Sequence, residues 1–297
     1  MRIGVIVQLN GTPDEGPRWD HLRAQAGAAE AAGFDLLVFE DAFQYPGAGL
    51  WHASVVAGAV AASTGRIDFG HSVVNAPFEH PARIAQMAAT ADEVSDGRFI
   101  LGIGAGNTPD DYEVLAIDAD PRYSRFAEAL DIVHRLLRTG EATFEGAHHR
   151  VEGAELRLRG PREGGLPIVV AAGGPKMIRL TARYGDGWNW WGALTGDPAG
   201  NAERLSLLDA ACAEEGRDPA EVHRSVDLYS VDPLGVTDDD RPGHVLASQD
   251  PDEIADRLAA FGEAGFDEVR VSLAGGPDDK APGIAALAPV VAALHGT

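Results

Sequence analysis

The segment PIVVAAGGPKMIRLTARYGDGWNWW, residues 167–191, contains a strand, a helix and a second strand in succession. The apolar run at 167–172 is typical of a buried strand. Residues 176–185 carry apolar side chains at helical spacing and predict an amphipathic helix, and the run at 187–191 predicts another strand. Two consecutive strands joined by a helix pair in parallel. This segment therefore predicts one unit of a parallel α/β sheet.

The same alternation extends through the rest of the chain. Expected strands cover residues 2–8, 36–40, 67–74, 99–104, 167–172, 187–191, 224–230 and 268–273. Expected helices cover residues 19–34, 50–64, 81–95, 123–140, 176–185, 202–216, 252–265 and 283–296. Eight strand–helix units in strict alternation predict an α/β fold of the closed (β/α)8 TIM-barrel type. A doubly wound open sheet is the alternative, because periodicity alone does not establish closure.

We expect one domain over residues 1–297, because no linker, low-complexity tract or fixed-period repeat divides the chain. Residues 141–165 have the pattern of a hairpin or loop and predict an insertion between the fourth helix and the fifth strand. In a (β/α)8 barrel the chemistry lies at the C-terminal ends of the strands. The turns that follow the strands are therefore the places to look for a site.

The composition excludes several classes of partner. The formal net charge is −22, with 46 acidic and 24 basic residues, which disfavours nucleic acid and anionic membrane surfaces. No apolar run is long enough to predict a membrane span. Cys212 is the single cysteine of the sequence and fits a reducing, cytoplasmic compartment. An anionic ligand would need a locally positive pocket, and Lys176 and Lys280 are the only two lysines.

The turn between the strand at 167–172 and the following helix has two glycines before a proline, AAGGPKM. One interpretation is structural, since glycine ends a strand and proline tolerates the first helical position. The other is functional, since backbone N–H groups at a helix N-terminus bind phosphate. Gly173 and Gly174 would allow close approach of a ligand, and Lys176 adds a positive charge. The residues alone leave both interpretations open.

Other motifs are weaker. The turn GIGAGN at 102–107 follows a strand but lacks the spacing of a dinucleotide-binding fingerprint. Asp41 ends the second strand, where it is either a ligand-binding carboxylate or a solvated loop residue. The histidines show no metal-ligand spacing, and we predict no metal site. The tryptophans at 188, 190 and 191 are either core residues or a wall for a planar ligand or an apolar substrate.

Three stretches together resemble the bacterial-luciferase-like barrel superfamily: GFDLLVFEDAF, DEVSDGRFILGIGAG and PIVVAAGGPKMIRLTARYGDGWN. Members use reduced FMN to activate oxygen, or the deazaflavin coenzyme F420 to move a hydride. The stretches AAGGP, GHSVVNAPFEHP and GEATFEGAHHRVEGAEL are more similar to the F420-dependent branch. The resemblance thus implies an oxidoreductase with a deazaflavin bound at the barrel mouth.

The resemblance also implies positions for the cofactor. Asp41 corresponds to an acid near the deazaflavin ring, and Ser72 and Val73 to a bulge with a non-proline cis peptide that backs the ring. The remaining implied cofactor residues are Asn75, Ala105, Gly106, Asp110, Gly173, Gly174, Lys176 and Met177. A histidine and a glutamate of the sugar-phosphate dehydrogenases of this superfamily are replaced here by Ala42 and Asn107. The remaining candidates for catalytic proton transfer are Asp41, His52 or a water molecule.

From this resemblance we expect an F420-dependent oxidoreductase that transfers a hydride between the deazaflavin and a small organic substrate. An FMN-dependent monooxygenase that uses reduced flavin and O2 is the alternative, and a barrel that binds its ligand without turnover is a third. The resemblance and the apolar helix SVVAGAVAA at 54–62 predict a homodimer. The loops NGTPDEGPRW and VDPLGVTDDDRPGHVLASQD match nothing that would identify the substrate.

Overall fold

The computed structural model describes residues 1–11, 16–45, 47–106, 109–191, 198–237 and 245–296. Its core is a closed parallel sheet, because β9 pairs with β10 as well as with β8. The eight strands that complete this ring are β1 (Arg2–Val7), β2 (Leu36–Phe39), β3 (Asp68–His71), β5 (Phe99–Gly104), β8 (Ile168–Ala171), β9 (Gly187–Trp191), β10 (His223–Val231) and β12 (Glu268–Leu273). The predicted (β/α)8 barrel is confirmed, and the doubly wound alternative is excluded by this closure.

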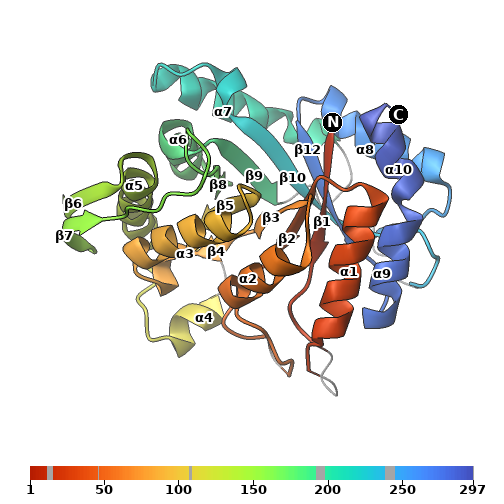
Figure 1. Cartoon of the computed structure of the whole chain (residues 1–297). Coiled ribbons are helices and arrows are strands. Elements are labelled where there is room, and N and C mark those ends of the chain that lie inside the picture. The colour runs from red at the N-terminus through yellow and green to blue at the C-terminus, as the bar shows by residue number, and fades with distance from the viewer. Residues whose placement is uncertain (12–15, 46, 107–108, 192–197, 238–244, 297) are drawn as a thin grey trace.

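Helices surround the sheet (Figure 1). They are α1 (Trp19–Ala32), α2 (Ala53–Ser63), α3 (Pro81–Val94), α5 (Arg122–Thr139), α6 (Pro175–Tyr184), α7 (Ala202–Glu214), α8 (Pro251–Glu263), α9 (Pro277–Ala286) and α10 (Ala288–His295). The short helix α4 (Pro109–Val114) follows β5 and was not predicted. The last expected helix is two helices, α9 and α10, and begins six residues earlier than the periodicity suggested. None of the described helices is long and apolar enough to cross a bilayer.

Smaller elements complete the chain. Short strands β4 (Val74–Asn75) and β11 (Val245–Leu246) extend the sheet beside β5 and β10. The predicted insertion is an antiparallel hairpin of β6 (Glu141–Glu145) and β7 (Arg150–Glu155), and it stands apart from the barrel beside α5 (Figure 1). Single 3₁₀ turns occupy Ala76–Phe78, Pro198–Asn201 and Pro219–Glu221.

Alternate residues of each strand face opposite sides of the sheet. One set packs against the helices in the main hydrophobic core, for example Leu37 and Phe39 of β2. The other set points into the barrel, where Leu36, Val38 and Ile100 belong to a separate small cluster. The barrel interior is therefore filled by side chains and is not a pore.

The end of the barrel formed by the N-terminal ends of the strands is closed by ion pairs. Arg2 Nη2 lies 2.8 Å from Asp68 Oδ2, and Arg2 Nε lies 3.3 Å from Glu268 Oε2. Glu268 is 1% exposed, whereas the side chains of Arg2 and Asp68, 37% and 31% exposed, cover it from the solvent side. The C-terminal ends of the strands form the opposite, open end.

Strands β3 and β5 approach closely where two glycines replace side chains inside the barrel. A Cβ atom on Gly102 would lie 1.8 Å from the carbonyl oxygen of His71, and one on Gly70 would lie 2.1 Å from that of Ile100. Both obstacles are backbone atoms, which cannot rotate away. These glycines are required by packing and set the spacing of the two strands.

We expect Gly102→Ala to lower the free energy of unfolding by at least about 2 kcal/mol, because the methyl group forces a backbone shift in a packed interior. Gly27→Ala is the matched control, since Gly27 is exposed on α1 and has nothing within 4 Å of its position. There alanine should stabilise the helix by about 0.5–1 kcal/mol. Urea unfolding measures both, and equal effects of the two substitutions would contradict this account.

Candidate functional site

The barrel mouth contains an irregularity directly after β3. The peptide bond between Ser72 and Val73 is cis, as the family resemblance implied. The Ser72 N–H donates to the carbonyl of Phe39 at 2.9 Å, which ties this bulge to the end of β2. A Cβ on Gly104 would lie 2.7 Å from the Val73 side chain, so β5 passes tightly beneath the bulge. The bulge therefore has a defined position in the mouth.

A buried polar network holds Ser72 from inside the barrel. The Ser72 hydroxyl donates to Asp227 Oδ2 at 2.8 Å and accepts from Arg270 Nη1 at 3.3 Å. Asn189 Nδ2 donates to Asp227 Oδ1 at 2.8 Å. Arg270 Nε donates to Glu268 Oε1 at 2.6 Å. Since both Arg270 and Glu268 are 1% exposed, this is a fully enclosed charged cluster beneath the mouth.

The two carboxylates of this network differ in their electrostatics. Burial raises the pKa of Asp227, although Arg270 opposes the shift. Burial alone would also raise the pKa of Glu268, but Arg270, with His223 and Arg2, lowers it to about 2. Glu268 is therefore the firmly ionised partner of Arg270, and Asp227 is the carboxyl that holds its proton more readily.

Asp41 and Asn75 form a second linkage across the mouth. Asp41 Oδ2 accepts the Asn75 N–H at 3.1 Å, and the Asn75 side-chain amide donates to the Asp41 carbonyl. Burial raises the pKa of Asp41, and the hydrogen bond from Asn75 partly offsets this. The resemblance had singled out both residues, and the structure brings them together beside the bulge.

Glu40 is a candidate that sequence reasoning missed. Its Oε2 accepts the hydroxyl proton of Tyr45 at 2.7 Å, and burial raises its pKa, with a further contribution from the charge of Asp227. Burial also raises the pKa of Tyr45. The alternation of side chains along β2 could have indicated Glu40 from the sequence. Leu36 and Val38 point into the barrel, and position 40 continues that face.

His52, the other predicted catalytic residue, has a capping position. Its Nδ1 accepts the Ser54 N–H at 3.3 Å at the N-terminus of α2, and its side chain is 58% exposed. Its Nε2 lies 3.8 Å from Glu79 Oε1. The geometry explains His52 as a helix cap, whereas Glu40 is half-buried in the mouth.

The glycine turn after β8 is open toward solvent. Gly174 is the N-cap of α6, Pro175 is its first residue, and nothing lies within 4 Å of a Cβ built on Gly174. Gly173 has a different role, because a Cβ there would lie 2.8 Å from the Trp190 ring. Lys176 lies near the turn, with its Nζ 5.6 Å from the centre of the Tyr123 ring, and Met177 packs against the core.

Arg204 of α7 adds a second cation to this turn, which the sequence did not reveal. It donates to the carbonyl of Gly173, and its guanidinium lies 3.8 Å above the Trp190 ring. The tryptophans thus separate into different roles. Trp188 is fully buried and donates to the Ala172 carbonyl at 2.8 Å, whereas Trp191 is 51% exposed.

The turn after β5 contributes backbone to the same mouth. Gly106 has a φ of +70°, which favours glycine. The Tyr112 hydroxyl donates to the Ala105 carbonyl at 2.5 Å and fixes the turn. Asp110 is exposed in the first turn of α4, and Asn107 lies outside the described residues. In the described part of the chain no group of three His, Cys, Asp or Glu residues could hold a metal ion.

Comparison with known proteins adds to this geometry. The profile of a family described as luciferase-like monooxygenase matches residues 1–231. The 4-hydroxyprotoasukamycin monooxygenase of Streptomyces nodosus subsp. asukaensis is 40% identical over 124 residues, 41% of this chain and 33% of that protein. The F420-dependent hydroxymycolic acid dehydrogenase of Mycobacterium tuberculosis is 31% identical over 237 residues, 77% of this chain and 62% of that protein. The chain thus matches less than two thirds of either relative.

Solved structures share the whole fold. An F420-dependent secondary alcohol dehydrogenase in complex with an F420-acetone adduct superposes with a TM-score of 0.82 at 21% identity, covering 99% of this chain and 98% of that one. The oxygenating constituent of 3,6-diketocamphane monooxygenase from Pseudomonas putida, in complex with FMN, gives 0.76 at 18% identity, covering 98% and 96%. At these identities the likeness establishes the barrel architecture.

The buried network makes a testable contribution to stability. We expect Arg270→Met to lower the free energy of unfolding by about 3–5 kcal/mol at pH 8, because Glu268 and Asp227 lose their buried counter-ion. The loss should shrink as the pH falls, because the uncompensated carboxyls of the variant take up protons from above their usual pKa downward, whereas the parent keeps Glu268 ionised until the pH approaches its pKa of about 2. Urea unfolding across this pH range measures the effect.

Arg257→Met is the control, because Arg257 forms an exposed pair with Glu253 at 2.8 Å. It should cost no more than about 1 kcal/mol at any pH. A loss for Arg270→Met that does not change with pH would mean that packing, and not charge, dominates its contribution.

Proposed function

Because the chain belongs to the luciferase-like monooxygenase family, we propose that it is an F420-dependent oxidoreductase acting on a small organic substrate. The observation that carries this proposal is the combination, at one barrel mouth, of the Ser72–Val73 bulge and the open turn at Gly174. The F420-dependent relative that aligns with 77% of the chain supports the choice of cofactor.

The residues present fit such a cofactor. The turn at Gly173 and Gly174 leaves the N-terminus of α6 free of side chains, and a helix N-terminus favours a phosphate group. Lys176 and Arg204 would add positive charge, in a chain whose overall charge is −22. Met177 of α6 packs against the core and would hold this helix in place.

The ring would lie against the bulge at Ser72 and Val73. Asp41 and Asn75 would contact its polar edge, since their mutual hydrogen bonds place both beside the bulge. The turn at Ala105 and Gly106, with Asp110 at its far side, would border the connecting chain of the cofactor.

When bound, the deazaflavin supplies a ring carbon that accepts or returns a hydride. Glu40 is the group that we assign to proton transfer. Its ionised form would take the hydroxyl proton from an alcohol substrate, and its acid form would return the proton to a carbonyl in the reverse direction. Burial and the hydrogen bond from Tyr45 hold this carboxyl in the mouth. Asp41 is the second candidate for this role, and His52 the third.

An FMN-dependent monooxygenase is the second candidate function. The monooxygenase that is 40% identical over 124 residues favours it, as does the fold shared with the FMN-bound diketocamphane enzyme. Titration with F420 and with FMN under air separates the two, because a reduced deazaflavin persists in oxygen whereas reduced FMN reoxidises.

The proposal extends to assembly and compartment. Val55 on α2 is 73% exposed, and exposed apolar side chains of this kind suit a subunit contact. We propose a cytoplasmic homodimer, whose mass in light scattering would be twice that of one chain.

We expect Gly174→Asp to weaken F420 binding by at least about 100-fold, because the new carboxylate occupies the open turn and repels the phosphate. Lys176→Ala should cost less, roughly 1 kcal/mol, since the helix terminus remains. Gly164→Asp is the matched control, because Gly164 is exposed in the loop before β8 and also has nothing within 4 Å. Fluorescence titration measures the F420 affinity of all three variants. If a folded Gly174→Asp protein bound F420 as tightly as the parent, the phosphate would not lie at this turn.

We expect Glu40→Gln to lower kcat for alcohol oxidation by about 100-fold or more, because the amide cannot accept the proton. In the parent the rate should rise with pH through a Glu40 pKa above its usual range, since the ionised form is the base. In Glu40→Gln this rise of the rate with pH should be absent, while the affinity for F420 stays unchanged. Rates for a panel of short secondary alcohols across pH test this. If the variant still showed the rise, Asp41 or another group would be the proton acceptor.

A further inference from the structure

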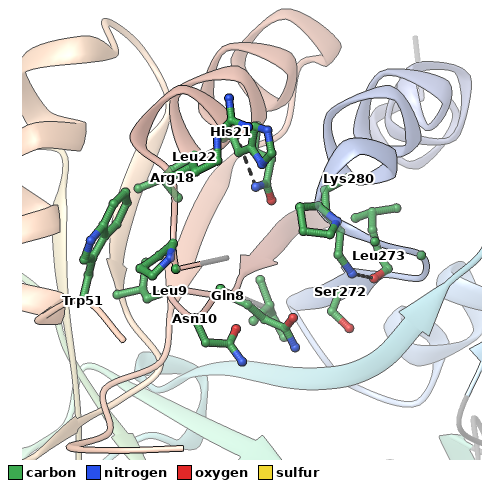
Figure 2. A pocket seen from close by; sticks show the side chains of 18 residues that line it. Gln8, Leu9, Asn10, Arg18, His21, Leu22, Trp51, Ser272, Leu273 and Lys280 are labelled. Carbon is green, nitrogen blue, oxygen red and sulfur yellow. Dashed lines mark hydrogen bonds between the residues drawn. The ribbon is translucent and has the colours of Figure 1, made fainter. Parts of the chain in front are cut away.

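A cavity of about 280 Å³ opens beside the barrel mouth, between the end of β1, the start of α1 and the turn from β12 to α9 (Figure 2). Gln8, which follows β1, and Ser272, near the end of β12, line its lower side in this view. Trp51 and Lys280 lie on opposite sides (Figure 2). The cavity therefore lies next to the barrel mouth, at the C-terminal ends of β1 and β12.

The lining has a charge opposite to that of the chain. None of the described residues that line the cavity is an aspartate or glutamate, although the chain has 46 of these. Arg18, His21 and Lys280 all contribute to the lining. Arg18 is paired with Asp20 at 2.5 Å, and His21 lies 3.5 Å from Asp278. The remaining positive charge is that of Lys280.

Lys280 has fewer partners than its ammonium group can bind. An ammonium group has three donors. Within the described ranges Lys280 Nζ donates only to the carbonyl of Leu273, and no carboxylate lies within ion-pair distance. Burial lowers its pKa. A half-buried cation at a cavity wall with unused donors is suited to an anion from outside the protein.

The opposite wall contains the main apolar surface. Trp51, Leu9 and Leu22 lie there beside Arg18, away from Lys280 (Figure 2). A ligand that fills the cavity would therefore contact apolar surface along its body and the ammonium group at one end. One available cation matches a singly charged group better than a phosphate dianion.

We propose that this cavity binds the substrate and that Lys280 holds a carboxylate at the end of an apolar chain. This inference rests on the proposed function. The substrate class is a carboxylic acid whose reactive carbon lies toward Gln8, at the barrel mouth. Lys280 is thus a specificity residue and takes no part in hydride or proton transfer.

The test uses hexanoate and hexan-1-ol as probes of the full chain, measured by calorimetric titration. Hexanoate should bind the parent more tightly than hexan-1-ol, and Lys280→Met should weaken hexanoate binding by at least about tenfold. Hexan-1-ol binding should be unchanged in this variant. Lys280→Arg retains the charge and should retain most of the hexanoate affinity, which also tests the pocket if Lys280→Met folds poorly.

Two results would overturn the proposal. One is equal hexanoate affinity in the parent and in folded Lys280→Met. The other is a parent that binds hexan-1-ol as tightly as hexanoate or binds neither. F420 titration of the same variants separates this from the proposed function: normal F420 binding with no Lys280 effect rejects the carboxylate pocket alone, whereas Lys280-dependent hexanoate binding without F420 binding rejects the cofactor assignment alone.

Discussion

The barrel is organised around Arg270, a guanidinium enclosed between two carboxylates. Glu268 lies 2.6 Å away on one side, and Asp227 Oδ1 lies 3.7 Å away on the other. Enclosing a charge without partners would cost several kcal/mol, so the positions of these three side chains are mutually dependent. Ser72 joins the same network through its hydroxyl. The bulge at the mouth is therefore positioned by charges on the opposite side of the barrel.

The architecture was accessible from the sequence because it depends on periodicity. Parallel strands such as 99–104 are continuous apolar runs, and the glycine-and-proline turn at 173–175 marks a strand–helix boundary wherever it occurs. Closure was less accessible, since the pairing of β9 with β10 is a spatial fact that no local pattern encodes. The division of the last helix at Leu287 also escaped the pattern, because the apolar spacing continues across it.

The site divides in the same way. Gly174 and Asp41 stand at strand ends within recognisable motifs, so sequence alone could indicate them. Glu40 and Arg204 could not be identified this way, because their roles depend on the residues that they contact. Glu40 accepts a hydrogen bond from Tyr45. Arg204 lies over the Trp190 ring and donates to the Gly173 carbonyl. Such contacts depend on side-chain direction and on residues far apart in the chain. His52 shows the reverse, a suggestive residue type whose geometry is that of a helix cap.

The ion pairs of Arg2 affect how a ligand can reach the barrel interior. Arg2 binds Asp68 and Glu268 at the N-terminal ends of the strands, and the charged network of Arg270 lies between them and the mouth, so the interior offers no passage from that end. Any molecule that reaches the interior would therefore have to enter and leave at the C-terminal ends of the strands. Side chains that narrow that end would slow its binding and its release together.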